Sequence, residues 1–194
     1  MSYVRQVARL GAAHPAAAGV TLLAGAALGF AAGLAADPLR RAALQGGETL
    51  AGDWVDILKA EHKLVDKAFE LLLRTGDTET GKRRAILKKI SWSLYKHGLQ
   101  EEAAIYPALR ESREDAARRL ADEHFSIKSF IYELDTTPAD SDAWLRTARA
   151  FHELIARHVR EEEDDVFPAL REHLSKDENA ALGRRMLYEG FKIA

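Results

Sequence analysis

The sequence predicts an all-α protein, an antiparallel up-down four-helix bundle made of two related helix hairpins, with an added N-terminal helix rich in Ala and Gly. After residue 50, apolar residues recur every three or four positions, as they do on the buried face of a helix, and no alternating strand pattern appears. Turn signals at 74–77, 111–114 and 136–140 divide this region into four amphipathic segments. Amphipathic helices joined by short links pack as an up-down bundle.

The composition limits the chemistry that the chain can perform. Cysteine is absent from the 194 residues, so disulfides, thiolate nucleophiles and Cys-ligated metal sites are excluded. His and carboxylate side chains remain as the strong metal ligands. The 28 Lys and Arg residues against 30 Asp and Glu residues give no basic excess, and we therefore expect no nucleic-acid partner.

The chain divides into three parts by composition. Residues 1–49 contain a hydrophobic helix and a linker, residues 50–176 contain the four-helix bundle, and residues 177–194 form a short C-terminal helix or tail. The tail carries an apolar face, which either covers an end of the bundle or binds a partner.

The N-terminal part contains a candidate membrane anchor. Residues 16–36 form an uncharged run of 21 residues, long enough as a helix to cross a hydrocarbon layer of ~30 Å. Gly25, Gly29 and Gly33 place a flat stripe on one face, which would allow helix–helix self-association. We therefore expect a cytoplasmic domain tethered to the inner membrane through residues 16–36. A cleaved signal peptide and a soluble cytoplasmic protein, with this helix packed on the bundle, are the alternatives.

Each of the four amphipathic segments places a histidine in its apolar stripe, and two segments add a glutamate one turn later. Burying an ionised carboxylate costs several kcal/mol or more unless it is paired or bound to a metal, so a shared cation would explain the cluster. A buried polar network without metal is the alternative explanation. The candidate metal ligands are His62, His97, Glu101, His124, His158 and Glu162.

An internal repeat relates the two halves of the bundle. Residues 97–111 and 158–172 are identical at eight of fifteen positions, and the Glu-His pair at 61–62 recurs at 123–124. Two hairpins of one ancestry would supply two equivalent half-sites, which suits two metals bridged by two carboxylates. Pro107 and Pro168 occupy the same place in both repeats and are expected to bend or end the helices beyond the site.

Several further polar residues are not among the six candidates. The other histidines lack the repeat and the phase and are expected at the surface or behind the ligands. Asp66, one turn beyond His62, could reach a metal, but a solvated or hydrogen-bonded role is expected. These other histidines are His14, His152 and His173.

Over residues 52–175 this pattern resembles the bacterial hemerythrin-like HHE cation-binding domains. The resemblance implies a non-haem di-iron cofactor, two Fe ions with an oxo or hydroxo bridge, in which Glu101 and Glu162 bridge the ions, the four histidines cap them and O2 binds at a vacant position. Oxygen-carrying members have a further His where this chain has Lys128. Their fourth helix uses a carboxylate five residues after the His, which here is Glu163, whereas Glu162 at four has the better phase.

These observations leave three functions open. The first is a di-iron protein that binds or senses O2 or a related small molecule, NO or peroxide. The second is a di-iron oxidoreductase that consumes peroxide or NO, and the third is a membrane-tethered structural bundle without metal. Whether the chain is an enzyme stays open, and no catalytic residue is assigned. Ferritin-like and zinc-hydrolase sites are disfavoured because no ExxH and no HExxH spacing occurs. The His and Glu donors suit Fe, Mn or Zn, and the resemblance favours iron.

Overall fold

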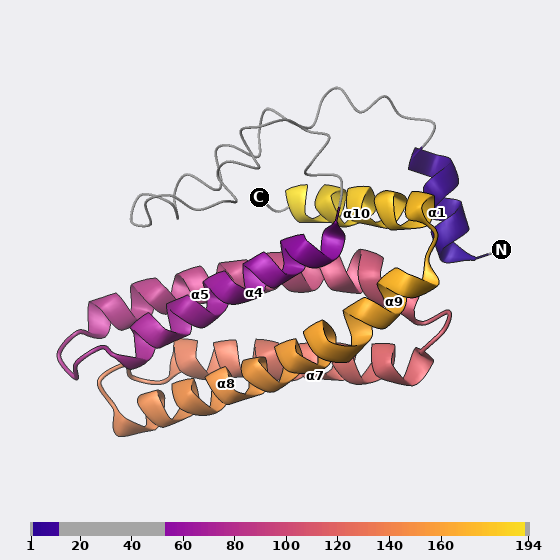
Figure 1. Cartoon of the computed structure of the whole chain (residues 1–194). Helices are drawn as coiled ribbons and strands as arrows, with labels where there is room; N and C mark the ends of the chain where they lie inside the picture. Colours follow the sequence, from indigo (N-terminus) through magenta and orange to yellow (C-terminus); the bar gives the residue numbers. More distant parts are fainter. Residues whose placement is uncertain (1, 12–52, 193–194) are drawn as a thin grey trace.

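Four long antiparallel helices form the body of the molecule (Figure 1). The computed structural model describes residues 2–11 and 53–192 of the chain. The described residues are helical apart from short links and contain no strand, which confirms the predicted all-α bundle. The helices are α1 (Tyr3–Gly11), α4 (Trp54–Leu73), α5 (Thr80–Gln100), α6 (Tyr106–Leu109), α7 (Glu114–Thr136), α8 (Asp142–Glu161), α9 (Phe167–His173) and α10 (Lys176–Phe191), with π-helical turns η1 (Glu101–Ile105) and η2 (Glu162–Val166).

Local sequence signals explain where several helices begin. The Asp53 side chain accepts a hydrogen bond from the backbone N–H of Val55 at 3.1 Å and caps α4. The Ser141 hydroxyl accepts from the N–H of Trp144 at 3.2 Å and caps α8. Ser175 begins α10 with a capping box. The links between the long helices fall at 74–79, 110–113 and 137–141, close to the predicted turns.

The two prolines do not end their helices. In both repeats the helix passes through a five-residue π turn and then continues, with the proline in the first turn of the next α-helical stretch. Pro107 has no N–H with which to bond the Ala103 carbonyl four residues earlier. That carbonyl instead accepts a hydrogen bond from the Tyr3 hydroxyl at 2.8 Å.

Two apolar clusters fill the bundle. The first contains Trp54 and Phe167 and lies toward the end that α1 and α10 cover. The second contains Phe69 and Phe151 and lies toward the links at 74–79 and 137–141. In every long helix of the bundle, one candidate histidine lies between the residues of the two clusters. The core is thus two apolar layers separated by a polar layer.

The C-terminal helix covers one end of the bundle. α10 packs against α5, η1 and α4, and α1 packs against α10 (Figure 1). Leu182 and Met186 of α10 are fully buried in the first apolar cluster. Covering the bundle end is therefore the role that the structure gives to this segment, of the two that the sequence left open.

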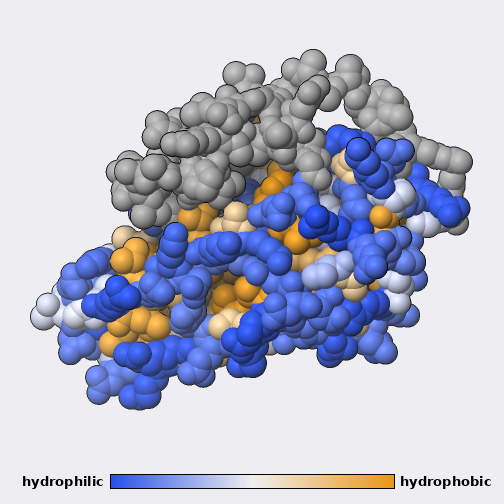
Figure 2. All heavy atoms as spheres, in the orientation of Figure 1, coloured by the Kyte–Doolittle hydropathy of each residue, from blue (hydrophilic) through white to orange (hydrophobic). Residues whose placement is uncertain are grey.

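The candidate anchor at 16–36, its glycine stripe and His14 lie outside the described residues. Among the helices that are described, none combines the length and the apolar character that a membrane span requires. On the face seen in Figure 2 the described surface is mainly hydrophilic, with apolar side chains showing in the seams between helices.

Two neighbouring leucines test the assignment of the buried face of α4. Leu72 has no exposed surface and Leu71 is 57% exposed. We expect Leu72→Ala to reduce the free energy of unfolding by about 2–5 kcal/mol because it leaves a cavity in the second cluster. The matched change Leu71→Ala should cost less than about 0.5 kcal/mol. Urea denaturation of both variants measures this difference, and equal losses would show that the helix face is misassigned.

Candidate metal centre

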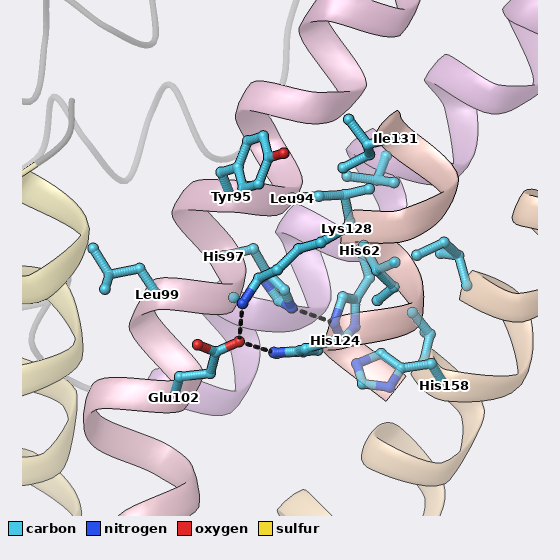
Figure 3. Close-up of a pocket in the computed structure, with 15 residues that line it drawn as sticks. His62, Leu94, Tyr95, His97, Leu99, Glu102, His124, Lys128, Ile131 and His158 are labelled. Carbon is cyan, nitrogen blue, oxygen red and sulfur yellow. Dashed lines mark hydrogen bonds and ion pairs between the residues drawn. The ribbon is translucent and has the colours of Figure 1, made fainter. Parts of the chain in front are cut away.

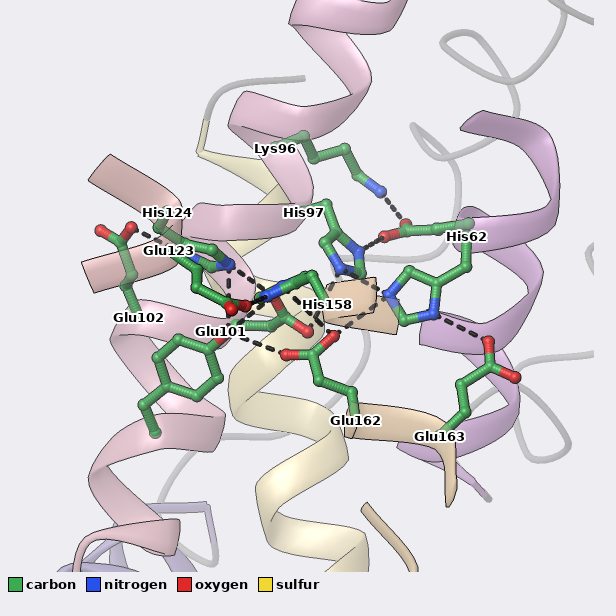
Figure 4. A network of polar contacts seen from close by, with 12 residues as sticks. His62, Lys96, His97, Glu101, Glu102, Glu123, His124, His158, Glu162 and Glu163 are labelled. Atoms are coloured by element: carbon green, nitrogen blue, oxygen red, sulfur yellow. Dashed lines mark hydrogen bonds and ion pairs between the residues drawn. The ribbon is translucent and has the colours of Figure 1, made fainter. Parts of the chain in front are cut away.

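The six predicted ligands come together in the polar layer at the middle of the bundle (Figure 4). All four histidines are at most 6% exposed, and both glutamates have no exposed surface. His62 comes from α4 and His124 from α7, while α5 with η1 and α8 with η2 each supply a His and a Glu. The two hairpins thus contribute equally, as the repeat predicts.

These residues form two overlapping groups that share both carboxylates. In each group the candidate donor atoms lie within 4.8 Å of one another. Each group pairs the two histidines of one hairpin with Glu101 and Glu162, so the six residues could hold two cations and share both carboxylates. The groups are His62, His97, Glu101 and Glu162, and Glu101, His124, His158 and Glu162.

A carboxylate holds each imidazole from behind. Every one of the four histidines bonds a glutamate through Nδ1, which directs Nε2 toward the centre of the cluster (Figure 4). A carboxylate on one ring nitrogen fixes the tautomer and leaves the other nitrogen free to bind a metal. The Nδ1-to-oxygen pairs are His62 with Glu163 at 2.8 Å, His97 with Glu61 at 3.0 Å, His124 with Glu102 at 2.9 Å and His158 with Glu123 at 2.7 Å.

The four supporting glutamates occupy equivalent positions in the two halves of the internal repeat. Glu61 and Glu123 precede the candidate ligands His62 and His124 in the chain but support the histidines of the neighbouring helix. Glu102 and Glu163 come directly after the two buried glutamates in the chain. They too support histidines of another helix, His124 and His62. Glu163 therefore stands behind His62, and Glu162 is the carboxylate that enters the cluster. Sequence reasoning did not assign these roles, although the repeated Glu-His and Glu-Glu pairs are their signal.

Both buried glutamates sit at the start of a π turn. The Glu101 carbonyl accepts from the N–H of Tyr106, five residues later, and the Glu162 carbonyl accepts from Phe167 in the same way. The extra residue shifts the helical phase of the residues after it, so Tyr106 and Phe167 face the core although the α-helical period does not predict it.

Tyr106 is a further residue of the centre that the sequence did not predict. Its hydroxyl donates to Glu162 Oε1 at 2.8 Å and lies 3.0 Å from His124 Nε2 and 3.4 Å from Glu101 Oε2. Phe167 occupies the equivalent place in the other repeat and stacks on His62. The centre is therefore asymmetric, with a hydroxyl on one side only.

Some inward-facing atoms are paired, as His62 Nε2 is with His97 Nε2 at 2.9 Å, but three are not. Glu101 Oε1, Glu162 Oε2 and His158 Nε2 are fully buried and have no hydrogen-bond partner. The nearest opposite groups lie 3.2 Å from the Glu101 atom and 3.4 Å from the other two. An unpaired buried acceptor is costly, and imidazole nitrogen and carboxylate oxygen are good ligands for Fe, Mn or Zn. The residues present therefore fit a pair of cations.

In the metal-free protein, protonated histidines balance part of the negative charge of the buried glutamates. Burial opposes the charge on each imidazole, but Glu101 and Glu61 raise the pKa of His97 well above its ordinary value. Burial likewise opposes the charge on His124, yet its hydrogen bonds to Glu101 and Glu102 raise its pKa to about 9. Burial would raise the pKa of Glu101, but His97 and His124 hold it well below its usual range. The hydrogen bond to His124 lowers the pKa of Glu102 to about 2.

The remaining polar residues lie outside the cluster. Asp66 pairs with His152, Oδ1 to Nε2 at 2.7 Å, and is therefore hydrogen-bonded rather than directed at the centre. Lys128 donates to Glu102 Oε1 at 2.8 Å and supports the glutamate behind His124. His173 is exposed near the end of α9.

The fold and this cluster define a four-helix-bundle protein with a His and Glu cation centre. The model of the hemerythrin HHE cation-binding domain matches residues 53–170, more than half of the chain. The chain therefore belongs to that family, which confirms the resemblance found in the sequence.

Two proteins related in sequence and one of the same fold are distant from this chain. The chain is 24% identical over 128 residues to an uncharacterised hemerythrin-like protein of Schizosaccharomyces pombe, an alignment that covers 64% of this chain and 62% of that protein. It is 25% identical over 138 residues to a DNA nickase of Nostoc sp., an alignment that covers 71% of this chain and 39% of that protein. The chain thus spans less than two thirds of either relative. A hemerythrin HHE cation-binding domain-containing protein from Mycobacterium kansasii has the same fold, with a TM-score of 0.63 and 22% identity over 72% of this chain and 85% of that chain.

The raised and lowered pKa values predict how pH affects the metal-free protein. A histidine with a raised pKa stabilises the fold fully below its unfolded value of 6.5, and for His124 this is lost as the pH rises through about 9. A glutamate with a lowered pKa stabilises the fold above 4.5, and for Glu102 this is lost as the pH falls toward about 2.

We therefore expect the melting temperature of the full chain in chelator to be highest between about pH 4.5 and 6.5 and to fall on both sides. Circular dichroism melts across this range measure it. A melting temperature that climbs steadily from about pH 6 to 9 would contradict the charge pairing described here.

Proposed function

We propose that this chain is a non-haem di-iron protein that binds or senses O2 or a related small molecule, NO or peroxide. The observation that carries the proposal is the pair of overlapping His2Glu2 groups that share Glu101 and Glu162. Membership of the cation-binding family supports it. Iron, when bound there, supplies a reversible change of oxidation state and a position for a small ligand.

The chain's own residues would divide the work in three ways. The Nε2 atoms of the four histidines and the two shared carboxylates would hold the metal. The glutamates behind the imidazoles keep each ring oriented, since such outer partners strengthen a ligand and fix its tautomer. The apolar layers on either side limit the contact of the centre with water.

A di-iron oxidoreductase that consumes peroxide or NO is the second candidate. Tyr106 favours it, because its hydroxyl is a buried proton donor that touches both shared carboxylates. Burial and the charges of Glu101 and Glu162 raise the pKa of Tyr106 well above its ordinary value, so the hydroxyl keeps its proton. It would be available to a ligand that takes up protons as it reacts.

Metal content of designed variants tests the proposal. The wild-type full chain, loaded anaerobically with Fe(II), should hold two irons and develop a visible absorption band on exposure to air. Glu101→Ala and Glu162→Ala should each lose one or both irons because each removes a donor from both groups. Glu172→Ala changes an exposed glutamate of α9 and should keep both irons.

Two results would refute the proposal. Full iron content in both ligand variants would show that neither carboxylate is shared. A folded wild-type chain that takes up no iron, and whose melting temperature is unchanged by chelation, would favour the structural bundle, because a ligand bound only to the folded state raises its stability.

A further inference from the structure

A cavity of about 260 Å³ rests on the histidine layer, on the side of the second apolar cluster (Figure 3). The four ligand histidines form its polar floor. Its walls are aliphatic side chains from all four long helices: Val65, Leu94, Ile127, Ile131, Ile155 and Val159.

The cavity is larger than a diatomic gas or hydrogen peroxide requires. A water molecule occupies roughly 30 Å³, and an apolar cavity of about 150 Å³ is enough to admit benzene. Its volume and its aliphatic walls therefore fit an organic molecule, whose apolar surface would be stabilised by leaving water.

The cavity owes part of its space to a difference between the two repeats. Gly98 is the counterpart of Val159, so α5 lacks the side chain that α8 carries at this position. A Cβ added at Gly98 would lie 3.5 Å from the His124 ring, and a larger side chain would extend into the space above it. Nothing in the general fold requires glycine here, because Gly98 lies inside a regular helix.

The mouth of the cavity lies beside Lys128 and Glu102. Lys128 of α7 reaches across to Glu102, and both side chains line the cavity and are partly exposed (Figure 3). Asp66, the counterpart of Lys128 in the other repeat, pairs instead with His152. Among the described residues, the ion pair between Lys128 and Glu102 therefore lies at the cavity in one repeat and has no equivalent at Asp66 in the other.

We infer that this cavity binds a small organic molecule with an apolar body of about the size of benzene and one hydroxyl or hydroperoxyl end. The body lies against the aliphatic walls, and the polar end points to the histidine floor, where a metal would be held. This inference rests on the proposed function. Of the small molecules that function includes, the cavity favours organic hydroperoxides over O2, NO and hydrogen peroxide.

Binding can be tested without turnover by using an unreactive alcohol. The probe is 2-phenyl-2-propanol, titrated into the full chain with labelled isoleucine methyl groups, metal-free and iron-loaded. We expect saturable chemical-shift changes in the cavity isoleucines Ile127, Ile131 and Ile155. Ile105 belongs to the first apolar cluster and Ile57 packs against it, on the other side of the histidine layer, so neither should respond.

Matched glycine variants connect binding to the cavity. Gly98→Val restores the side chain of the other repeat and should weaken binding at least tenfold. Gly81→Val is the control, because a Cβ at this helical glycine meets nothing within 4 Å, and it should bind as wild type does. Ile131→Phe fills the cavity from a position two turns away from His124, so it tests the same space if valine at 98 disturbs that ligand.

The outcomes separate this inference from the proposed function. Two irons per chain with no response of the cavity methyls would overturn the inference and leave the di-iron proposal standing. Binding that Gly98→Val and Ile131→Phe both leave unchanged would also overturn it. Alcohol binding in the cavity of a chain that takes up no iron would support the binding site and refute the di-iron proposal.

Discussion

Two carboxylates with no exposed surface, Glu101 and Glu162, constrain the rest of this structure. A buried ionised carboxylate is destabilising by several kcal/mol unless positive charge or hydrogen bonds compensate it. Four imidazoles surround the pair, and four outer glutamates hold those imidazoles. Apolar side chains then fill the bundle above and below this layer but not within it. The polar centre thereby fixes which residue of each helix faces the middle.

The two π turns connect this requirement to the backbone. Each π turn adds one residue directly after the His and Glu pair. The pair itself therefore keeps its α-helical spacing, while the residues after it face a different direction. The rotation brings Tyr106 onto the shared carboxylates and Phe167 onto His62. In the first repeat, the Ala103 carbonyl that Pro107 cannot bond accepts from Tyr3, so the N-terminal helix is attached directly beside the centre.

Much of the fold and the positions of the six cluster residues could be predicted from the sequence, because helical period and internal repetition can both be read without knowing how the helices pack. The period places His62 and His97 on buried faces, and the repeat pairs them with equivalents in the second hairpin. The α-helical period could not reveal Tyr106. The period assumes the same number of residues in every turn, and the π turn before Tyr106 contains one more. Nor could it reveal the carboxylates behind the imidazoles, because each bridges two helices whose relative register only the packed bundle sets.

The central claim, that the buried cluster holds two cations through shared carboxylates, is tested most directly by anomalous diffraction from crystals of the iron-loaded full chain. We expect two iron peaks inside the bundle, one between His62 and His97 and one between His124 and His158, both in contact with Glu101 and Glu162. A single peak, or peaks confined to surface carboxylates, would contradict the shared-carboxylate centre.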